Sequence, residues 1–489
     1  MNSSKDGKIF YKNKFIIDNI EYKAKTIFIL MEAEVKSVVD NYRVIDLQSE
    51  FSYDLSKFYG IDNLLTTNKM IREFASIHNT DVDIYKLDKV EQAEIIWDEL
   101  FVKRTPISDN CIEIISIMKN IGLEKLMFDF DLNGIRKYFG VNGINSSNII
   151  EYIDKIFDLS GVNYTITSNK IFDKNEIIYL ENRFTPKKND IVLYKKNNIT
   201  EKVKITHCHC LQGYPLNYNI IFDNGREKNT LWNYLFMCDE QFNKITKRFK
   251  NSLNIDILLR EYNKCLNNGL IKKYGFNENT HGVRDYLLYW CHSLRPEFFT
   301  MTLENETCYD FLNIDKDWVG SVSQILNTII IPLSIELSIP ISIKIENTTF
   351  IDDCDKYNLN NLYKLCKSFP KCKFMAYFLY EVNYNKLFLL SRELSNLHIN
   401  GCFLNNLKLT EENTKNMINV FNLNCSFNYS GSTVLEHFIY KWKQYKKIII
   451  DILIDKYKKL ELLGLKISKK NIERDVDDLF NHYYLDKNK

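Results

Sequence analysis

Short runs of apolar, often β-branched residues recur along the chain and are mostly separated by segments with helical periodicity. Eight of these runs predict strands, at residues 42–47, 162–167, 202–211, 298–303, 341–345, 373–379, 398–404 and 425–429. Strands that alternate with helices are typical of parallel sheets with crossover helices, and therefore of the α/β class. Over one long chain the alternation favours a closed (β/α)8 barrel, the TIM barrel.

Two regions carry helical periodicity and little strand signal. Residues 64–157 include VEQAEIIWDELF at 90–101, whose apolar positions form one broad helical face. We therefore predict one barrel domain over residues 1–489, with residues 64–157 as a helical insertion packed near the barrel mouth. A long helix is predicted from Val434 to Leu463, with Trp442 packed against the barrel beside Phe438 and Ile439.

The amino-acid composition indicates which kinds of binding partner and which cellular compartment to expect. The 65 Lys and Arg residues against 63 Asp and Glu leave a net charge of +2, so neither nucleic acid nor a membrane surface is expected as a partner. The polar start MNSSKDGKIFYKNKF predicts no signal peptide, and 12 cysteines in 489 residues predict free thiols in the cytoplasm. Abundant Asn, Ile and Lys indicate an AT-rich genome. A protein partner and a homo-oligomer stay open.

The sharpest local motif is His-Cys-His-Cys at residues 207–210. All four side chains can bind a transition metal. On a strand, however, alternation places His207 and His209 on one face and Cys208 and Cys210 on the other. One face then offers only two ligands, so a metal would need further ligands from elsewhere. We expect a packed strand here and keep a metal site at His207 and His209 as the alternative.

Several segments taken in order resemble the uronate isomerases. VIDLQSEF at 44–51 is similar to that family's first strand, V-I-D-T-H-T-H-L, and YGIDNLL at 59–65 is similar to the G-I-D-E-L-L that follows it. VLEHFIYKW at 434–442 is similar to V-L-D-Q-L-I-Y-K-W. Further similar segments are EQAEIIWDELFVKRTPIS at 91–108, LSGV at 159–162 with NKIFD at 169–173, RPEFFTMTL at 295–303, FPKCKFMAYFL at 369–379, RELSNL at 392–397 and NGC at 400–402.

The resemblance implies an amidohydrolase-type barrel with a helical insertion after the first strand. It also implies the family's reaction, the interconversion of glucuronate or galacturonate with the corresponding ketose acid. Members use one divalent metal, held by the first strand's His-x-His and by an Asp at the last strand. The metal and nearby acid–base groups act on the sugar's carbonyl and hydroxyl.

The positions that carry this chemistry depart from the family pattern. Gln48 and Glu50 align with the His-x-His pair, and Asn68 and Asn385 align with two further histidines. Ser430-Gly431-Ser432-Thr433 aligns with S-D-A-R, so Gly431 replaces the metal-binding Asp and Thr433 replaces the substrate-facing Arg. Gln is a weak neutral metal ligand, and Gly has no side chain that could bind a metal. Without the Arg, the site also lacks the guanidinium group that would bind the substrate carboxylate through two parallel hydrogen bonds.

The sequence therefore predicts a catalytically degenerate homologue, a pseudoenzyme that serves as a scaffold or interaction protein and holds no cofactor. We expect Gln48, Glu50 and Gly431 to lie close together at the carboxyl ends of the strands. One alternative is an active aldose–ketose isomerase of uronates with shifted site residues and one divalent metal such as Zn or Mn. Another is a different metal-dependent reaction that recruits His207, His209 and Glu50.

Overall fold

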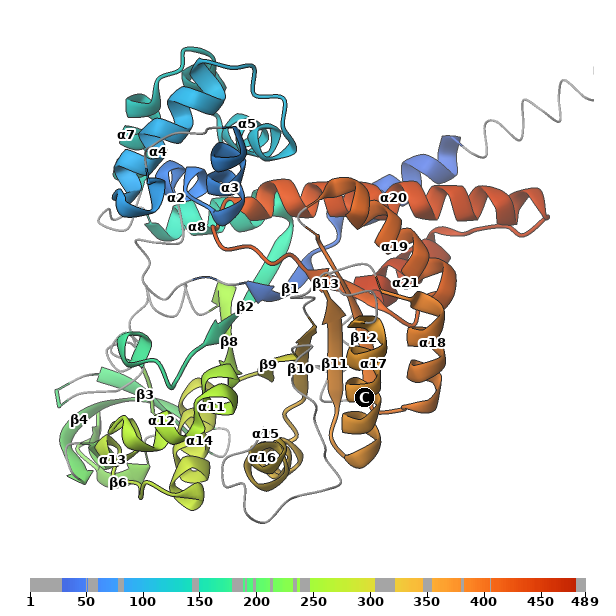
Figure 1. Ribbon diagram of the computed structural model, residues 1–489. Helices are drawn as coiled ribbons and strands as arrows, with labels where there is room; N and C mark the ends of the chain where they lie inside the picture. Colours follow the sequence, from blue (N-terminus) through green and yellow to red (C-terminus); the bar gives the residue numbers. More distant parts are fainter. Residues whose placement is uncertain are drawn as a thin grey trace, which may run out of the picture.

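The computed structural model describes most of the chain, namely residues 29–49, 51, 60–77, 83–142, 149–177, 188–189, 191–196, 199–211, 214–231, 235–237, 247–303, 322–345, 354–379, 382–404 and 406–480. Within these residues, eight parallel strands form one sheet, and its first and last strands lie against each other in a nearly closed barrel (Figure 1). In spatial order they are β1 (Val44–Ser49), β2 (Val162–Asn169), β8 (Phe249–Asn254), β9 (Phe299–Leu303), β10 (Ile341–Ile345), β11 (Phe374–Phe378), β12 (Leu397–Cys402) and β13 (Ser426–Tyr429). The predicted barrel fold is confirmed.

Helices connect the strands and cover the outside of the barrel. The segment between β1 and β2 contains α2 (Ile61–Leu65), α3 (Asn68–Ile77), η2 (Ile84–Lys86), α4 (Lys89–Trp97), η3 (Asp98–Val102), α5 (Asp109–Ile121), α6 (Glu124–Phe128), α7 (Leu132–Asn142) and α8 (Ile149–Ser160). The later helices are α11 (Asp256–Arg260), α12 (Tyr262–Asn267), α13 (Leu270–Lys273), α14 (Thr280–Leu294), α15 (Val322–Ile325), η5 (Leu326–Ile330), α16 (Ile331–Leu337), α17 (Cys354–Ser368), α18 (Tyr384–Glu393), α19 (Leu407–Phe421), α20 (His437–Leu462) and α21 (Lys469–Phe480). A further helix over residues 29–41 precedes β1.

Strand β10 shows how the sequence pattern builds the barrel wall. Ile341, Ile343 and Ile345 are fully buried in the main core with the surrounding helices. Since alternate residues face opposite sides of a strand, Ser342 and Lys344 face the barrel interior. The wall is therefore apolar toward the helices, while its inner face leaves room for polar side chains.

One predicted barrel strand is wrong. Residues 202–211 belong to β4 (Ile199–Leu211), which lies in a separate five-stranded antiparallel sheet. The other strands of that sheet are β3 (Ile191–Lys196), β5 (Tyr214–Phe222), β6 (Glu227–Leu231) and β7 (Leu235–Met237). The sheet has a small core of its own, in which Val203 and Ile205 pack against Tyr218 and Ile220. The apolar pattern predicted a strand correctly but could not assign it to a sheet.

The barrel's third strand is β8, with the sequence FKNSLN, which the apolar pattern missed. Only Phe249 and Leu253 are apolar in this segment. Its other contacts are polar: Lys250 forms an ion pair with Glu297 at 3.1 Å, and Asn251 Nδ2 donates to the Leu294 carbonyl at 2.8 Å. Polar contacts of this kind leave no mark in a hydropathy pattern.

Helix α20 fastens the end of the barrel to its beginning. Trp442 is fully buried, and its Nε1 donates a hydrogen bond of 3.0 Å to Asp46 Oδ2 on β1. Its ring stacks on Tyr445 and meets Phe480 of α21 edge-on. Trp442 shares the main core with Phe438 and Ile439, so it packs as a structural residue.

Lys446, one turn further along α20, reinforces this junction. Its ammonium group donates to the carbonyls of Asp40 and Tyr42, at 3.1 and 2.7 Å, just before β1 begins. Burial lowers the pKa of Lys446 to about 8. The two carbonyls provide polar partners for an ammonium group that has lost most of its water.

Among the described residues, none of the helices combines the length and the apolar character that a bilayer crossing needs.

The hydrogen bond between Trp442 and Asp46 gives a stability prediction. Replacing Trp442 by Phe keeps an aromatic ring but removes the donor to a buried carboxylate. Trp290 on α14 is a matched control, because it is equally buried and its Nε1 has no hydrogen-bond partner within the described structure. We expect Trp442→Phe to lower the free energy of unfolding by about 1.5–3 kcal/mol more than Trp290→Phe does. Urea unfolding followed by circular dichroism measures this difference, and equal losses would contradict the assigned role of the bond.

Candidate functional site

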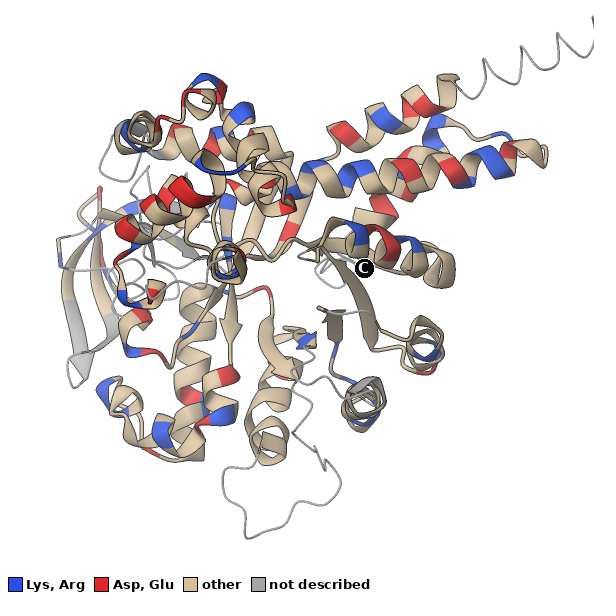
Figure 2. Ribbon diagram, turned by 45° about the horizontal axis from the view of Figure 1, so that its top comes forward, with Lys and Arg blue, Asp and Glu red and all other residues tan. Residues whose placement is uncertain are grey.

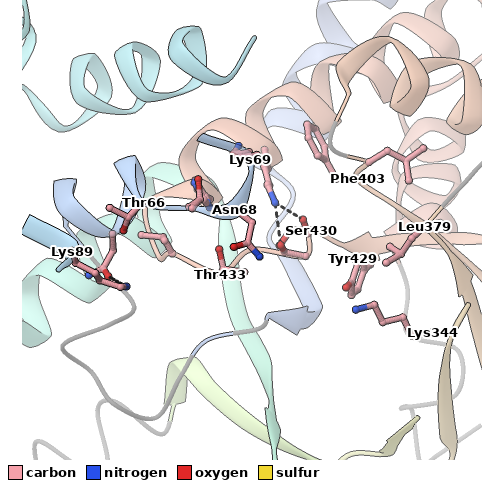
Figure 3. A pocket seen from close by; sticks show the side chains of 17 residues that line it. Thr66, Asn68, Lys69, Lys89, Lys344, Leu379, Phe403, Tyr429, Ser430 and Thr433 are labelled. Atoms are coloured by element: carbon pink, nitrogen blue, oxygen red, sulfur yellow. Dashed lines mark hydrogen bonds between the residues drawn. The ribbon is translucent and has the colours of Figure 1, made fainter. Parts of the chain in front are cut away.

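A pocket of about 440 Å³ lies where the carboxyl ends of strands β10 to β13 meet the helical segment and the start of α20 (Figure 3). The carboxyl ends of the strands are where barrel enzymes place their active sites. Its lining residues are Asn63, Thr66, Thr67, Asn68, Lys69, Lys89, Lys344, Leu379, Phe403, Leu404, Tyr429, Ser430, Gly431, Thr433, Val434, His437 and Lys441.

The lining is rich in positive charge. Four lysines from four different elements contribute to it, namely Lys69 of α3, Lys89 of α4, Lys344 of β10 and Lys441 of α20. Among the lining residues that the structure describes, none is an Asp, Glu or Cys. Elsewhere on the described helices, basic and acidic residues are interspersed (Figure 2). The remaining polar lining consists of His437, amides and hydroxyls, so the pocket combines cationic groups with neutral hydrogen-bonding groups.

Two of these lysines are fixed by hydrogen bonds to neutral groups. Lys441 Nζ donates to the backbone carbonyls of Ser430 and Gly431, at 2.8 and 3.1 Å, and so holds the turn that follows β13. Lys89 Nζ donates to Asn63 Oδ1 at 2.6 Å.

Lys69 is placed differently, because it forms a direct ion pair with Glu113 of α5. Glu113 lies behind the pocket wall, and its other carboxylate oxygen is 3.7 Å from His437 Nε2. Burial, with Lys69 and Lys441 nearby, holds the pKa of His437 well below its ordinary value. The imidazole is therefore neutral at neutral pH, and its contact with Glu113 is not an ion pair.

The turn after β13 has a backbone suited to glycine. Gly431 has a φ of 57°, in the left-handed region. A Cβ at this position would lie 3.2 Å from Cε1 of Tyr429, which is tighter than an ordinary contact. The left-handed φ and this close contact together favour glycine at position 431, and an aspartate would need the Tyr429 ring to shift slightly.

Glu436, at the start of α20, connects the helical segment to the barrel. Its Oε1 accepts hydrogen bonds from the Tyr152 hydroxyl of α8 at 2.6 Å and from the Gly60 backbone N–H at 3.1 Å. The carboxyl is completely buried, and burial raises its pKa to about 7. This contact positions α2 and α8 relative to the pocket.

The structure brings some of the predicted site residues together. Asn68, Gly431 and Thr433 line the same pocket. Gln48 lies near the carboxyl end of β1, which neighbours β13, but its side chain is not described. Glu50 lies outside the described residues.

Other predicted site residues lie elsewhere. Asn385 is exposed at the start of α18 and does not line the pocket. His207 is exposed on β4, opposite Asn219, and His209 follows on the same strand, so both belong to the antiparallel sheet and not to a barrel strand. Within the described part of the chain, no three His, Cys, Asp or Glu side chains are grouped closely enough to hold a metal ion.

Sequence reasoning missed the lysines. Lys344 could have been found, because it is the charged residue that alternates with isoleucines in ISIKI and so faces the barrel interior. The other lysines are ordinary charged residues within helical patterns. Only the docking of α3, α4 and α20 around the mouth places them in one pocket.

Two solved structures resemble this chain along most of its length. The crystal structure of a uronate isomerase from Bacillus halodurans C-125 matches with a TM-score of 0.69 and 24% sequence identity, over 94% of this chain and 96% of that one. A uronate isomerase from Thermotoga maritima matches with a TM-score of 0.55 and 10% identity, over 91% of this chain and 95% of that one. No family model matches the sequence, and no curated protein matches it significantly.

These likenesses and the strand order define the class of fold: the chain is a (β/α)8 barrel. Within that class it has the uronate isomerase-like fold, as the collinear sequence segments predicted.

The buried carboxyl of Glu436 predicts a pH-dependent stability. Its folded pKa of about 7 lies above the ordinary value of 4.5. The folded state therefore binds the proton more tightly than the unfolded state, and the resulting stability is lost as the pH rises from about 4.5 through 7. Glu436→Gln keeps the oxygen that accepts from Tyr152 and Gly60 but cannot ionise. We expect its stability relative to the wild type to rise by about 2–3 kcal/mol between pH 5 and pH 8.

Chemical denaturation of the Glu436→Gln and wild-type proteins at both pH values measures this change. Glu411→Gln, at an exposed position on α19, is the control for losing one carboxylate. A difference between wild type and Glu436→Gln that does not change with pH would show that the carboxyl is not the group that titrates.

Proposed function

We propose that this protein is a uronate isomerase homologue that no longer catalyses isomerisation and uses its barrel as a binding scaffold. The proposal rests on one observation: ammonium, amide and hydroxyl groups and the imidazole of His437 line the described barrel mouth, and none of these described lining residues offers the carboxylates that a divalent metal needs. It implies a cytoplasmic protein without a metal cofactor that acts through a ligand or a protein partner.

Metal binding at this mouth is disfavoured in two ways. A catalytic zinc site uses three protein ligands, usually His, Asp, Glu or Cys, and leaves one position open. Gly431 has no side chain to offer, and Asn68 and Thr433 are weak neutral ligands. In addition, the lysines that line the pocket repel a divalent cation through the low-dielectric interior.

Proton transfer is the second requirement of aldose–ketose isomerisation. The Asn68 amide cannot act as an acid or base near neutral pH. His437 favours the competing function, an active isomerase with shifted site residues, because its neutral ring lines the pocket and could accept a proton. A base alone is not sufficient, however, because negative charge develops on the sugar oxygen as the proton leaves, and a metal ion or another strong electrophile has to stabilise that charge.

Metal content and turnover test this proposal. We expect the purified protein, after dialysis, to contain no stoichiometric divalent metal in elemental analysis. We also expect no ketose to form from glucuronate or galacturonate in the presence of added zinc or manganese. Both expectations follow from the missing ligands at Gly431 and Asn68.

The variant His437→Gln distinguishes the two functions. Turnover by the wild-type protein that this variant abolishes would replace the non-catalytic proposal by the isomerase with shifted site residues. His207→Gln, on the antiparallel sheet, is the matched control, since that residue does not line the mouth.

A further inference from the structure

We propose that the chain docks on an anionic lipid surface through the tip of an arm that α20 forms with the helix over residues 29–41. The leucines at the end of α20 insert among the lipids, and the lysines around them contact the headgroups. The tip lies at the opposite end of α20 from the residues that line the barrel-mouth pocket, so this inference does not depend on the function proposed for that pocket.

The arm consists of two antiparallel helices that extend beyond the barrel (Figure 1). Lys446 of α20 donates to the carbonyl of Asp40, near the end of the shorter helix. Lys458, about three turns later on α20, forms an ion pair with Glu32, near the start of the shorter helix. The first residues of the shorter helix therefore lie beside the last turn of α20, and together they form the tip.

Large apolar side chains gather at this tip and are exposed to solvent. They are Ile29 and Leu30 of the shorter helix, Leu460 and Leu462 at the end of α20, and Leu463 and Leu465 in the turn that follows. The most exposed are Leu462 and Leu463, at 73% and 84% of full exposure. Single exposed leucines are common on protein surfaces, but a group of neighbouring ones marks a surface that binds something.

The turn that ends α20 is fixed by hydrogen bonds, and these explain only part of the apolar group. The Leu465 N–H donates to the Leu460 carbonyl, and the N–H of Gly464, whose φ is 90°, donates to a carbonyl one turn back in α20. These two bonds form a Schellman motif, in which an apolar residue after the glycine commonly packs on the last turn. This capping role accounts for leucine at 460 and 465. It does not account for Leu462 and Leu463, which project into solvent.

Lysines surround the apolar tip. Residues 456–470 contain Lys456, Lys458, Lys459, Lys466, Lys469 and Lys470, and one acidic residue, Glu461. Three of the lysines form exposed ion pairs with the carboxylates of Glu32, Asp455 and Glu473. With these carboxylates counted, six lysines stand against four acidic groups, so the tip keeps a charge of +2, as much as the whole chain. Figure 2 shows this end of the arm, tan at its tip with blue segments behind it.

Two of the lysines are well placed for anionic headgroups. Lys466 directly follows the exposed Leu465, and Lys470 lies in the first turn of α21. Both are exposed, and neither forms an ion pair or a side-chain hydrogen bond within the described structure. Each lysine near an anionic bilayer strengthens binding by about fivefold. The long apolar stem of lysine also lets the ammonium group stay at headgroup level while neighbouring leucines lie deeper.

The size and charge of the tip favour a lipid surface over a second copy of this chain. A stable protein–protein interface uses about 20–30 residues on each side, far more than the apolar tip offers. Two copies that meet tip to tip would also bring their lysines together. A bilayer needs no complementary surface, because leucines enter the boundary of the acyl chains and lysines contact the headgroups. The near-neutral charge of the whole chain hides this local arrangement.

Co-sedimentation of the full-length protein with lipid vesicles tests the proposal. We expect vesicles of equal parts phosphatidylcholine and phosphatidylglycerol to bind it at least about tenfold more tightly than vesicles of phosphatidylcholine alone. Added salt should weaken this binding, because it screens the lysines. No binding to the anionic vesicles, or equal binding to both kinds, would overturn the proposal.

A double variant, Leu462→Ser with Leu463→Ser, locates the inserting residues. It should weaken binding to the anionic vesicles by at least about tenfold, because it removes the most exposed apolar side chains of the tip. Leu389→Ser is the matched control, since Leu389 is 64% exposed on α18, and it should bind like the wild type.

A second double variant, Lys466→Gln with Lys470→Gln, tests the contact with the headgroups. It should weaken binding to the anionic vesicles by roughly tenfold or more. Its control is Lys264→Gln with Lys272→Gln, at exposed positions on α12 and α13. All the substituted side chains are exposed, so the thermal unfolding of each variant should match that of the wild type.

Unchanged vesicle binding by either tip variant would overturn the proposal. Sedimentation velocity without lipid tests the competing occupant: a wild-type dimer that the leucine variant dissolves would assign the tip to a second copy and overturn the lipid surface. Neither measurement involves metal or turnover, so its failure leaves the proposed function untouched.

Discussion

The junction between α20 and β1 is the constraint on which the rest of the molecule depends. A parallel barrel closes only if its last strand meets its first. Here α20, the helix that follows β13, is hydrogen-bonded to β1 and to the residues just before it. Trp442 donates to the buried Asp46 carboxylate, and Lys446 donates to the two carbonyls that precede the strand. These hydrogen bonds join residues that are about 400 positions apart in the sequence. They fix α20 to the start of β1, and α20 in turn contributes residues to the pocket at the barrel mouth.

The N-terminal part of the same helix also builds the site. Its first turn contributes Glu436, which holds α2 and α8 against the barrel, and His437, which lines the pocket. One turn later, Lys441 holds the turn at Gly431 through two backbone carbonyls. The closure of the barrel and the shape of the pocket are thus coupled through one rigid element. A fold of this kind can keep its architecture while its chemistry changes, because fold and site are separable.

The hydropathy pattern predicted the barrel strands correctly where apolar and polar residues alternate, as in ISIKI of β10. The three buried isoleucines of that strand form its face toward the helices. The pattern failed at β8, because Lys250 and Asn251 make polar contacts that hydropathy does not register. It also assigned residues 202–211 to the barrel, since a strand's own pattern does not reveal which sheet it joins. The candidate site was predicted in part: Asn68, Gly431 and Thr433 share a pocket, while Asn385 does not line it.

The sequence by itself determined the class of fold and the residue types at the positions that resemble the uronate isomerase site. These are properties of short segments, so they can be read from spacing and collinear similarity. Only the tertiary structure decided that Lys69, Lys89, Lys344 and Lys441 face one cavity. They lie on α3, α4, β10 and α20, which are far apart in sequence. Barrel closure and the packing of the helical segment against the mouth bring their charges together, and no local pattern encodes those two events.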